Sequence, residues 1–279
     1  MKIIIVIFIF LLGCSNNIPI KNPEKRVALV IGNQNYPTKK LANPINDAKE
    51  ITKILKKLNF DVIYLTDVSQ KKFNLALEKF KSKIDPNTLT FFYFSGHGNT
   101  IHKNSTETFL IMVEQNRDVW VSIHKLYEVL NQAGARNNII SIDACQDYKK
   151  GKNNKDSKGL YRTGYKVINY EDGTINLKKI IDDKYSYKRP PSTIISYSAE
   201  PNEKAKDSGL KDPKMSPYAY YLVKYLDNES IPIAEVFRRV RKGMLNDFKG
   251  TQRNSETNGL KENIWLQPAK AMPSPAPTT

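Results

Sequence analysis

The order of apolar segments constrains the fold of this 279-residue chain more than any other feature. Short continuous apolar runs, typical of buried strands, alternate with segments whose apolar residues recur at helical spacing. The strand-like runs are 26–31, 60–65, 89–94, 108–113, 138–142 and 192–198, and the helix-like segments are 44–58, 69–84, 122–132, 217–226 and 233–245. Such alternation predicts helical crossovers between parallel strands. We therefore expect an α/β fold with a mostly parallel sheet flanked by helices.

Composition and charge narrow the class of protein further. Forty per cent of the residues are apolar, which supports a packed core and argues against global disorder. The net charge of +16 could attract anionic lipid, nucleic acid or other polyanions. However, the lysines are spread along helices and loops without an interleaved aromatic stripe. We therefore favour a solvated basic surface and predict no specific nucleic-acid site.

The amino terminus has the pattern of an export signal. Residues 3–12 are almost wholly apolar, follow Lys2 and are too short to span a bilayer stably. The run ends in Leu-Leu-Gly-Cys, which resembles a bacterial lipobox whose cysteine, here Cys14, is acylated. An ordinary secretory signal, with this cysteine cut away or left free, is the alternative.

This leader predicts an exported lipoprotein in the cell envelope. Residues 1–13 would be the lipoprotein signal peptide and residues 14–25 a polar tether. Ser15 does not resemble an inner-membrane retention signal, so an outer membrane is favoured where the cell has one. Lipid on the first of the two cysteines would leave Cys145 as a lone thiol, unable to form an intramolecular disulfide.

The residues that carry chemistry follow two of the predicted buried strands. Cys145 comes after the run 138–142, and His97, in Ser-Gly-His-Gly, comes after the run 89–94. The carboxyl ends of parallel strands are where such sheets bind ligands. A thiol and an imidazole placed there are the components of a cysteine hydrolase, in which the imidazole removes the thiol proton. A buried inert thiol and a simple glycine turn are the structural alternatives.

Neighbouring residues add to the candidate site. Glycines on both sides of His97 would allow a tight turn and a close approach of bound peptide. Asp143 lies two positions before Cys145 in extended chain, so both side chains should point to one face. A carboxylate there disfavours a thiolate. We therefore favour a role in holding a cationic substrate side chain over the alternative, a cap on the following turn.

Taken together, these motifs resemble the caspase-like superfamily, especially metacaspases and bacterial caspase homologues of the peptidase C14 type. The His and Cys motifs lie 48 residues apart, near the spacing known for caspases. Further similarity lies in the first strand and its loop, the first-helix motif and the region after the long loop, namely RVALVIGNQNY (26–36), Asn46-Asp47-Ala48, SYSAEP (196–201), Ser216-Pro217-Tyr218 and Gly250-Thr251-Gln252. The resemblance covers about residues 26–147 and 190–267.

The resemblance implies a caspase-like three-layer sandwich and assigns roles to residues. His97 and Cys145 would form the catalytic dyad, and backbone N–H groups of Gly98 and Cys145 the oxyanion hole. The acids matching Asp47 and Asp143 line a pocket for substrate arginine or lysine in metacaspases. No cofactor is implied as a requirement. Calcium activates some metacaspases, but the sequence contains no clear calcium loop and no metal site.

The resemblance also divides the chain. It implies a p20-like catalytic region at 26–147, an intersubunit-type loop at 148–189, a p10-like region at 190–267 and a disordered tail at 268–279. We predict a membrane-tethered cysteine endopeptidase that acts on protein or peptide substrates after arginine or lysine. Two other classes remain open: a catalytically silent caspase-like interaction module, and a basic surface-binding lipoprotein.

Overall fold

The computed structural model describes residues 25–102, 106–116, 118–145, 188–200, 203–228, 230–250 and 252–267. Several predicted segments lie outside this range, namely the signal peptide, the tether with Cys14 up to residue 24, loop residues 148–187 and the tail.

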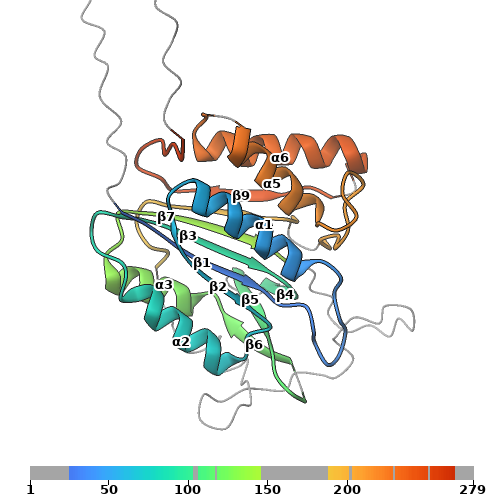
Figure 1. Cartoon of the computed structure of the whole chain (residues 1–279), viewed down its shortest axis with the longest axis horizontal. Coiled ribbons are helices and arrows are strands. Elements are labelled where there is room, and N and C mark those ends of the chain that lie inside the picture. Colours follow the sequence, from blue (N-terminus) through green and yellow to red (C-terminus); the bar gives the residue numbers. More distant parts are fainter. Residues whose placement is uncertain are drawn as a thin grey trace, which may run out of the picture.

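A six-stranded sheet forms the centre of the molecule (Figure 1). Its strands are β1 (Lys25–Gly32), β2 (Asp61–Thr66), β3 (Thr88–Ser95), β7 (Asn137–Asp143), β8 (Thr193–Tyr197) and β9 (Ser255–Asn258). They lie in the order β2-β1-β3-β7-β8-β9. The first five run parallel, and only the edge strand β9 is antiparallel. The predicted mostly parallel sheet is therefore confirmed.

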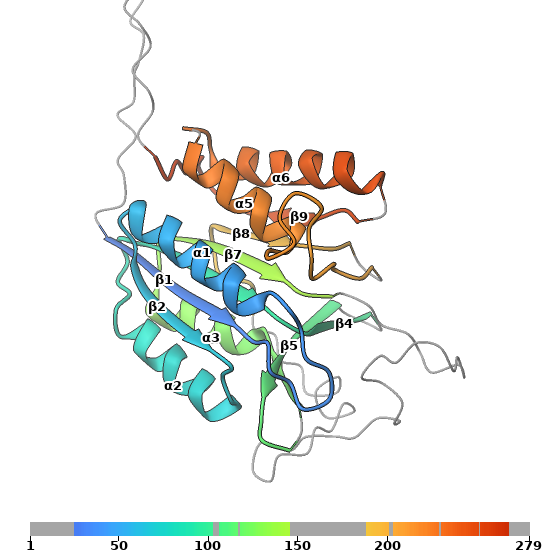
Figure 2. The same ribbon diagram turned by 45° about the vertical axis from the view of Figure 1, so that its right-hand side comes forward.

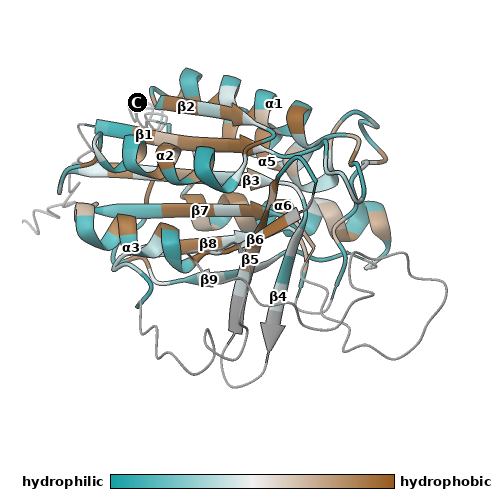
Figure 3. Cartoon of the chain, turned by 90° about the horizontal axis from the view of Figure 1, so that it is seen from below, coloured by the Kyte–Doolittle hydropathy of each residue, from teal (hydrophilic) through white to brown (hydrophobic). Residues whose placement is uncertain are grey.

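Helices cover both faces of this sheet and complete three layers. The helices are α1 (Pro44–Lys57), α2 (Gln70–Lys81), α3 (His124–Ala133), α5 (Pro217–Asn228) and α6 (Ile233–Phe248). One apolar cluster joins α1, α5 and α6 to alternate strand residues, and a second joins α2 and α3 to the opposite face. Figure 3 shows hydrophobic residues along β1 and β7 and hydrophilic residues on the outer surfaces of the helices. The predicted sandwich is confirmed.

Local sequence signals set the helix boundaries. Ser69 caps α2, because its side chain accepts a hydrogen bond from the Lys72 backbone at 3.2 Å. A proline begins α1, where its fixed φ suits the first turn. Gly134 ends α3 with φ of +68°, a left-handed conformation that glycine adopts without strain. No helix in the described ranges is long and apolar enough to cross a bilayer.

A second, three-stranded sheet was not expected from the sequence. It consists of β4 (Gly98–His102), β5 (Thr106–Val113) and β6 (Asp118–Ser122), all antiparallel. Figure 2 shows β4 and β5 of this sheet. Connections between these strands are only a few residues long, too short for a crossover, so antiparallel pairing is the geometry available. The predicted run 108–113 therefore joins this small sheet, which begins directly after His97.

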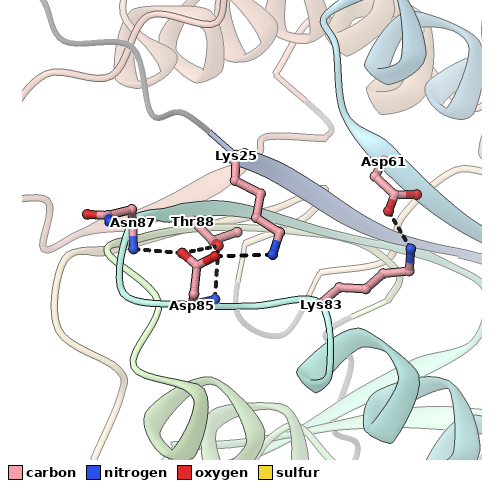
Figure 4. Close-up of polar contacts among 6 residues, drawn as sticks. All are labelled: Lys25, Asp61, Lys83, Asp85, Asn87 and Thr88. Atoms are coloured by element: carbon pink, nitrogen blue, oxygen red, sulfur yellow. Dashed lines mark hydrogen bonds and ion pairs between the residues drawn. The ribbon is translucent and has the colours of Figure 1, made fainter.

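Two ion pairs lie at the amino end of the main sheet. Figure 4 shows Lys25, at the start of β1, donating to Asp85 at 3.1 Å. It also shows Lys83 paired with Asp61 at the start of β2. The hydrogen bond from Lys25, followed by those from Thr88 and the Asn87 backbone, lowers the pKa of Asp85. Carboxylates at this end of the sheet are therefore exposed and matched by lysines.

Candidate active site at the carboxyl end of the sheet

Adjacent strands bring the His97 and Cys145 turns together. In the parallel pairing of β3 with β7, Ser95 lies opposite Asp143. The chain leaves β3 into the turn that carries His97, and there the Gly96 N–H donates to the Asp143 carbonyl at 3.2 Å. Because β7 ends at Asp143, Cys145 lies just beyond the same edge of the sheet. The sequence-based placement of both residues at strand carboxyl ends is confirmed.

The two turns touch at Gly98. A Cβ at this position would lie 2.6 Å from the Ala144 Cβ and 3.3 Å from the Cys145 carbonyl oxygen. The first of these distances is too short for any real side chain, and it involves atoms held close to the backbone. Glycine is therefore required for the histidine turn to lie directly against the cysteine turn.

The imidazole of His97 is held by the loop between β1 and α1. Its Nε2 lies 2.8 Å from the Lys39 carbonyl oxygen. Because a carbonyl can only accept, Nε2 must carry the hydrogen, and in the neutral ring Nδ1 then carries the accepting lone pair. The imidazole also packs against the Tyr36 ring at a tilted angle, with ring centroids 4.5 Å apart. This arrangement makes Nδ1 the proton acceptor of the ring.

Cys145 is partly buried and forms no disulfide. Its Sγ donates to the carbonyl oxygen of Ala205 at 3.7 Å. Ala205 belongs to the segment 203–216, which also contacts Asp143 through Ser216. Asp143 and Cys145 thus contact the same segment.

Two buried carboxyl groups lie beside the cysteine turn. Asp47 of α1 is fully buried, and Asp143 at the end of β7 is 5% exposed. Ser216 bridges them, because its N–H donates to Asp47 at 2.9 Å and its hydroxyl donates to Asp143. Tyr93 also donates to Asp143 at 3.3 Å, and Ser95 donates to Asp47 at 3.2 Å. We call Asp47 and Asp143 the acid pair.

The surroundings of the acid pair favour its uncharged form. Burial, with repulsion from Asp143, raises the pKa of Asp47 well above its usual range. Burial raises the pKa of Asp143 to about 6, against the opposing effect of the Ser216 hydrogen bond. Asp207 adds negative potential to both, while its carboxylate accepts hydrogen bonds from the Ala42 and Asn43 backbones. No lysine or arginine in the described part of the chain forms an ion pair with either member.

A positively charged ligand would be favoured by this arrangement. Buried carboxylates without a positive partner are unfavourable, and a guanidinium or ammonium group entering between them would relieve both burial and repulsion. A guanidinium also supplies several donors that match carboxylate geometry. By contrast, no group of three or more histidine, cysteine, aspartate or glutamate side chains that could hold a metal occurs among the described residues.

Several residues of the site carry no signal in the sequence. Lys39 and Ala205 act through backbone carbonyls, which any residue would supply. Ser216 caps α5, since its hydroxyl accepts from the Ala219 N–H at 2.9 Å. Its bridge between the two carboxyl groups becomes visible only when α1, β7 and α5 are packed together.

Comparison with known proteins identifies the class that this fold and site define. The family model described as Peptidase_C14, caspase domain, matches residues 25–264. The chain therefore belongs to the caspase-domain family, which confirms the resemblance found in its motifs and places it among caspase-type peptidases and related modules.

Individual relatives are more distant. The chain is 26% identical over 128 residues to mucosa-associated lymphoid tissue lymphoma translocation protein 1 of Homo sapiens, and 25% identical to the Mus musculus homologue. Each match covers 44% of this chain and 15% of the relative. The crystal structure of protein GSU0716 from Geobacter sulfurreducens aligns with a TM-score of 0.61, at 14% identity, over 85% of this chain and 94% of that chain. This last likeness confirms the fold alone.

Proposed function

We propose that this chain is a cysteine endopeptidase that cleaves protein or peptide substrates after arginine or lysine. Cys145 is the nucleophile, His97 is its general base, and the acid pair binds the side chain that precedes the scissile bond. The proposed reaction requires no cofactor, and the effect of calcium is part of the test below.

The observation that carries this proposal is the acid pair itself. Asp47 and Asp143 are buried, repel one another and lack a cationic partner among the described residues. Such an arrangement is costly for folding alone, and perturbed carboxyl groups of this kind concentrate at functional sites. The position of Asp143 two residues before the thiol supports a role in binding the substrate residue next to the bond that is cut.

The proposed reaction follows from the arrangement of the His97 ring. Nδ1 takes the proton of the Cys145 thiol, and the thiolate attacks the substrate carbonyl carbon. The oxygen that becomes negative is stabilised by the backbone N–H groups of Gly98 and Cys145. His97 then gives its proton to the leaving amine, and water, deprotonated by the same imidazole, hydrolyses the thioester.

The segment 203–216 contacts the nucleophile. The Ala205 carbonyl accepts the hydrogen bond of the Cys145 thiol. The thiol must break this bond to give its proton to His97. The same contact favours the second candidate function, an interaction module in which the thiol keeps this bond and no peptide is cut.

An assay with matched variants tests the proposal. The full chain in detergent is incubated with fluorogenic peptides that end in arginine, lysine or aspartate, with calcium or with a chelator. We expect cleavage after arginine and lysine that is lost in Cys145→Ala and His97→Ala and is insensitive to the chelator. Cleavage after aspartate would refute the acid-pair assignment, and absence of cleavage on every peptide would favour the interaction module.

We also propose that Cys14 carries lipid and tethers the enzyme to the cell envelope, at the outer membrane where one is present. The support is the lipobox-like Leu-Leu-Gly-Cys ending of the leader. Expression in a bacterium with radiolabelled palmitate should label the wild-type chain and leave Cys14→Ser unlabelled. Equal labelling of both, or label on neither, would contradict the tether without affecting the peptidase assignment.

A further inference from the structure

One loop surrounds the catalytic histidine on three sides. Residues 33–43 connect β1 to α1, and Tyr36 within this loop is fully buried. The Tyr36 ring packs on the imidazole of His97, and the Lys39 carbonyl accepts from Nε2 of that ring. The Tyr36 hydroxyl reaches the third side, the backbone of the histidine turn. Orientation of the imidazole is thus set by a segment far from it in sequence.

The Tyr36 hydroxyl connects the histidine turn to β5. It accepts a hydrogen bond from the His97 N–H at 2.9 Å and donates one to the Ile111 carbonyl at 2.9 Å. The Ile111 N–H in turn donates to the His97 carbonyl at 3.0 Å. Both backbone polar groups of His97 are therefore tied to the same strand residue, one directly and one through the tyrosine.

Neighbouring contacts fix this hydroxyl in place. A Cβ on Gly96 would lie 2.5 Å from it, so the hydroxyl fills the space that a side chain there would need. The loop itself is closed by the Leu41 N–H bond to the Gln34 carbonyl at 3.0 Å. At its start, the Asp67 carboxylate accepts from the Gln34 and Asn35 backbones at 2.8 and 2.9 Å. Hydrogen bonds on both sides of Tyr36 therefore hold the loop that carries it.

From these contacts we infer that Tyr36 is a positioning residue for His97, which holds the imidazole with its Nδ1 as the proton acceptor for the Cys145 thiol. The inference rests on the proposed function. The acid pair takes its hydrogen bonds from other residues, Ser216 among them, so Tyr36 acts on the rate of the chemical step and leaves recognition of the substrate cation unchanged. Without the hydroxyl, the His97 N–H loses this buried acceptor, whereas the Ile111 carbonyl keeps the hydrogen bond from the Asn33 side chain. The histidine turn therefore shifts to bring the N–H to another acceptor.

Tyr36→Phe tests this role, because it keeps the aromatic ring against the imidazole and removes the bridging oxygen. We expect kcat on an arginine peptide to fall about 10- to 100-fold, the size of effect that a small misplacement of a reacting group produces, with KM unchanged. Tyr221→Phe is the matched control, since it removes a tyrosine hydroxyl that donates to Asp247 at 2.7 Å between α5 and α6. The control should keep the wild-type kcat.

Imidazole NMR gives a readout that does not depend on activity. The chain has three histidines, so each ring can be assigned by substitution. In the wild type, His97 should be the tautomer protonated at Nε2, and Tyr36→Phe should show a mixture of tautomers. Gly96→Ala, which places a Cβ against the same hydroxyl while retaining the tyrosine, should produce the same mixture and serves where Tyr36→Phe does not fold.

The outcomes separate this inference from the proposed function. A wild-type kcat and tautomer in Tyr36→Phe would overturn the inference, as would a loss confined to KM. The rate of alkylation of the Cys145 thiol provides a double-mutant cycle. In a His97→Ala background, Tyr36→Phe should not lower this rate further. A further loss would also overturn the inference. A wild type that cleaves no peptide overturns the proposed function, and the tautomer measurement then decides the role of Tyr36.

Discussion

Carboxyl groups at the two ends of the central sheet differ in burial, in their partners and in the direction of their pKa shifts. At the amino end, Asp61 and Asp85 are exposed and paired with lysines (Figure 4). At the carboxyl end, Asp47 and Asp143 are buried, paired with each other through Ser216 and unmatched by any lysine or arginine in the described ranges. The pKa of Asp85 is lowered, whereas the pKa values of Asp47 and Asp143 are raised.

Under the proposed function, this difference separates carboxylates that stabilise the fold from carboxylates that bind the substrate cation. An exposed ion pair is satisfied in the folded chain and screened by water, so its removal has small consequences. A buried acid pair makes the folded state less stable at neutral pH until a cation enters it. We therefore expect substitutions at the two ends to have opposite effects on stability and very different effects on activity.

The largest effect is expected for Asp143→Asn. Ser216 and Tyr93 donate to the same Asp143 oxygen, so an asparagine oxygen can accept both bonds while the charge is lost. We predict that kcat/KM for an arginine peptide falls about 100-fold, as for loss of one partner from a buried charge contact. The midpoint of thermal unfolding should stay the same or rise, because repulsion with Asp47 disappears. A marked loss of stability with activity retained would refute the account.

A pH titration of stability should distinguish the acid pair from ordinary carboxylates. The folded pKa of Asp143, about 6, lies above that of an unfolded aspartate, so the folded state binds more protons between these values. Stability from this group is complete below the unfolded pKa and is lost as pH rises through about 6. We predict that the free energy of unfolding declines between about pH 4 and about pH 7 by more in the wild type than in Asp143→Asn. The free energy of unfolding is measured by denaturant titration at each pH. An equal decline with pH in the wild type and in Asp143→Asn would contradict this prediction.

Ser216→Ala should have a moderate effect on both properties. It removes the hydroxyl bridge to Asp143 and the cap on α5, while the backbone N–H to Asp47 remains. Loss of a serine cap costs about 1 kcal/mol, so the free energy of unfolding should fall by about that amount. Affinity for arginine peptides should fall less than in Asp143→Asn. Denaturant titration and inhibition constants for an arginine aldehyde measure the two effects, and an unchanged stability would argue against the cap.

The smallest effect is expected at the amino end. Asp85→Asn removes the exposed pair with Lys25 but keeps an oxygen that can accept from Thr88. The midpoint of thermal unfolding should decrease slightly, and the decrease should vanish in high salt, because exposed ion pairs are screened. Peptidase activity should be unchanged. A loss of activity comparable to that of Asp143→Asn would remove the distinction between the two ends.

Much of the fold could be predicted from the sequence because its buried strands are continuous apolar runs. The run 138–142 lies within β7, and Ser69 marks the start of α2 as expected. Three strands were missed, namely β4, β6 and β9. β9 is a four-residue edge strand, Ser-Glu-Thr-Asn, without an apolar run, so only its pairing with β8 defines it.

Only part of the candidate site could likewise be predicted from the sequence. Positions of His97 and Cys145 could be predicted, because strand carboxyl ends meet at one edge of a parallel sheet. The contacts of Lys39 and Ala205 could not, since they depend on backbone carbonyls brought in by loops. Asp47 was assigned through family resemblance, and its burial against Ser216 is a property of how α1 and α5 pack on the sheet.

Peptides that differ only in the charge of the residue before the cleaved bond test the central claim most directly. Citrulline has the shape of arginine without its positive charge, so the ratio of kcat/KM for the two peptides isolates the contribution of charge. We predict a preference for arginine of about 100-fold in the wild type that shrinks to within about tenfold in Asp143→Asn. Equal cleavage of both peptides by the wild type would show that the acid pair does not bind the substrate cation.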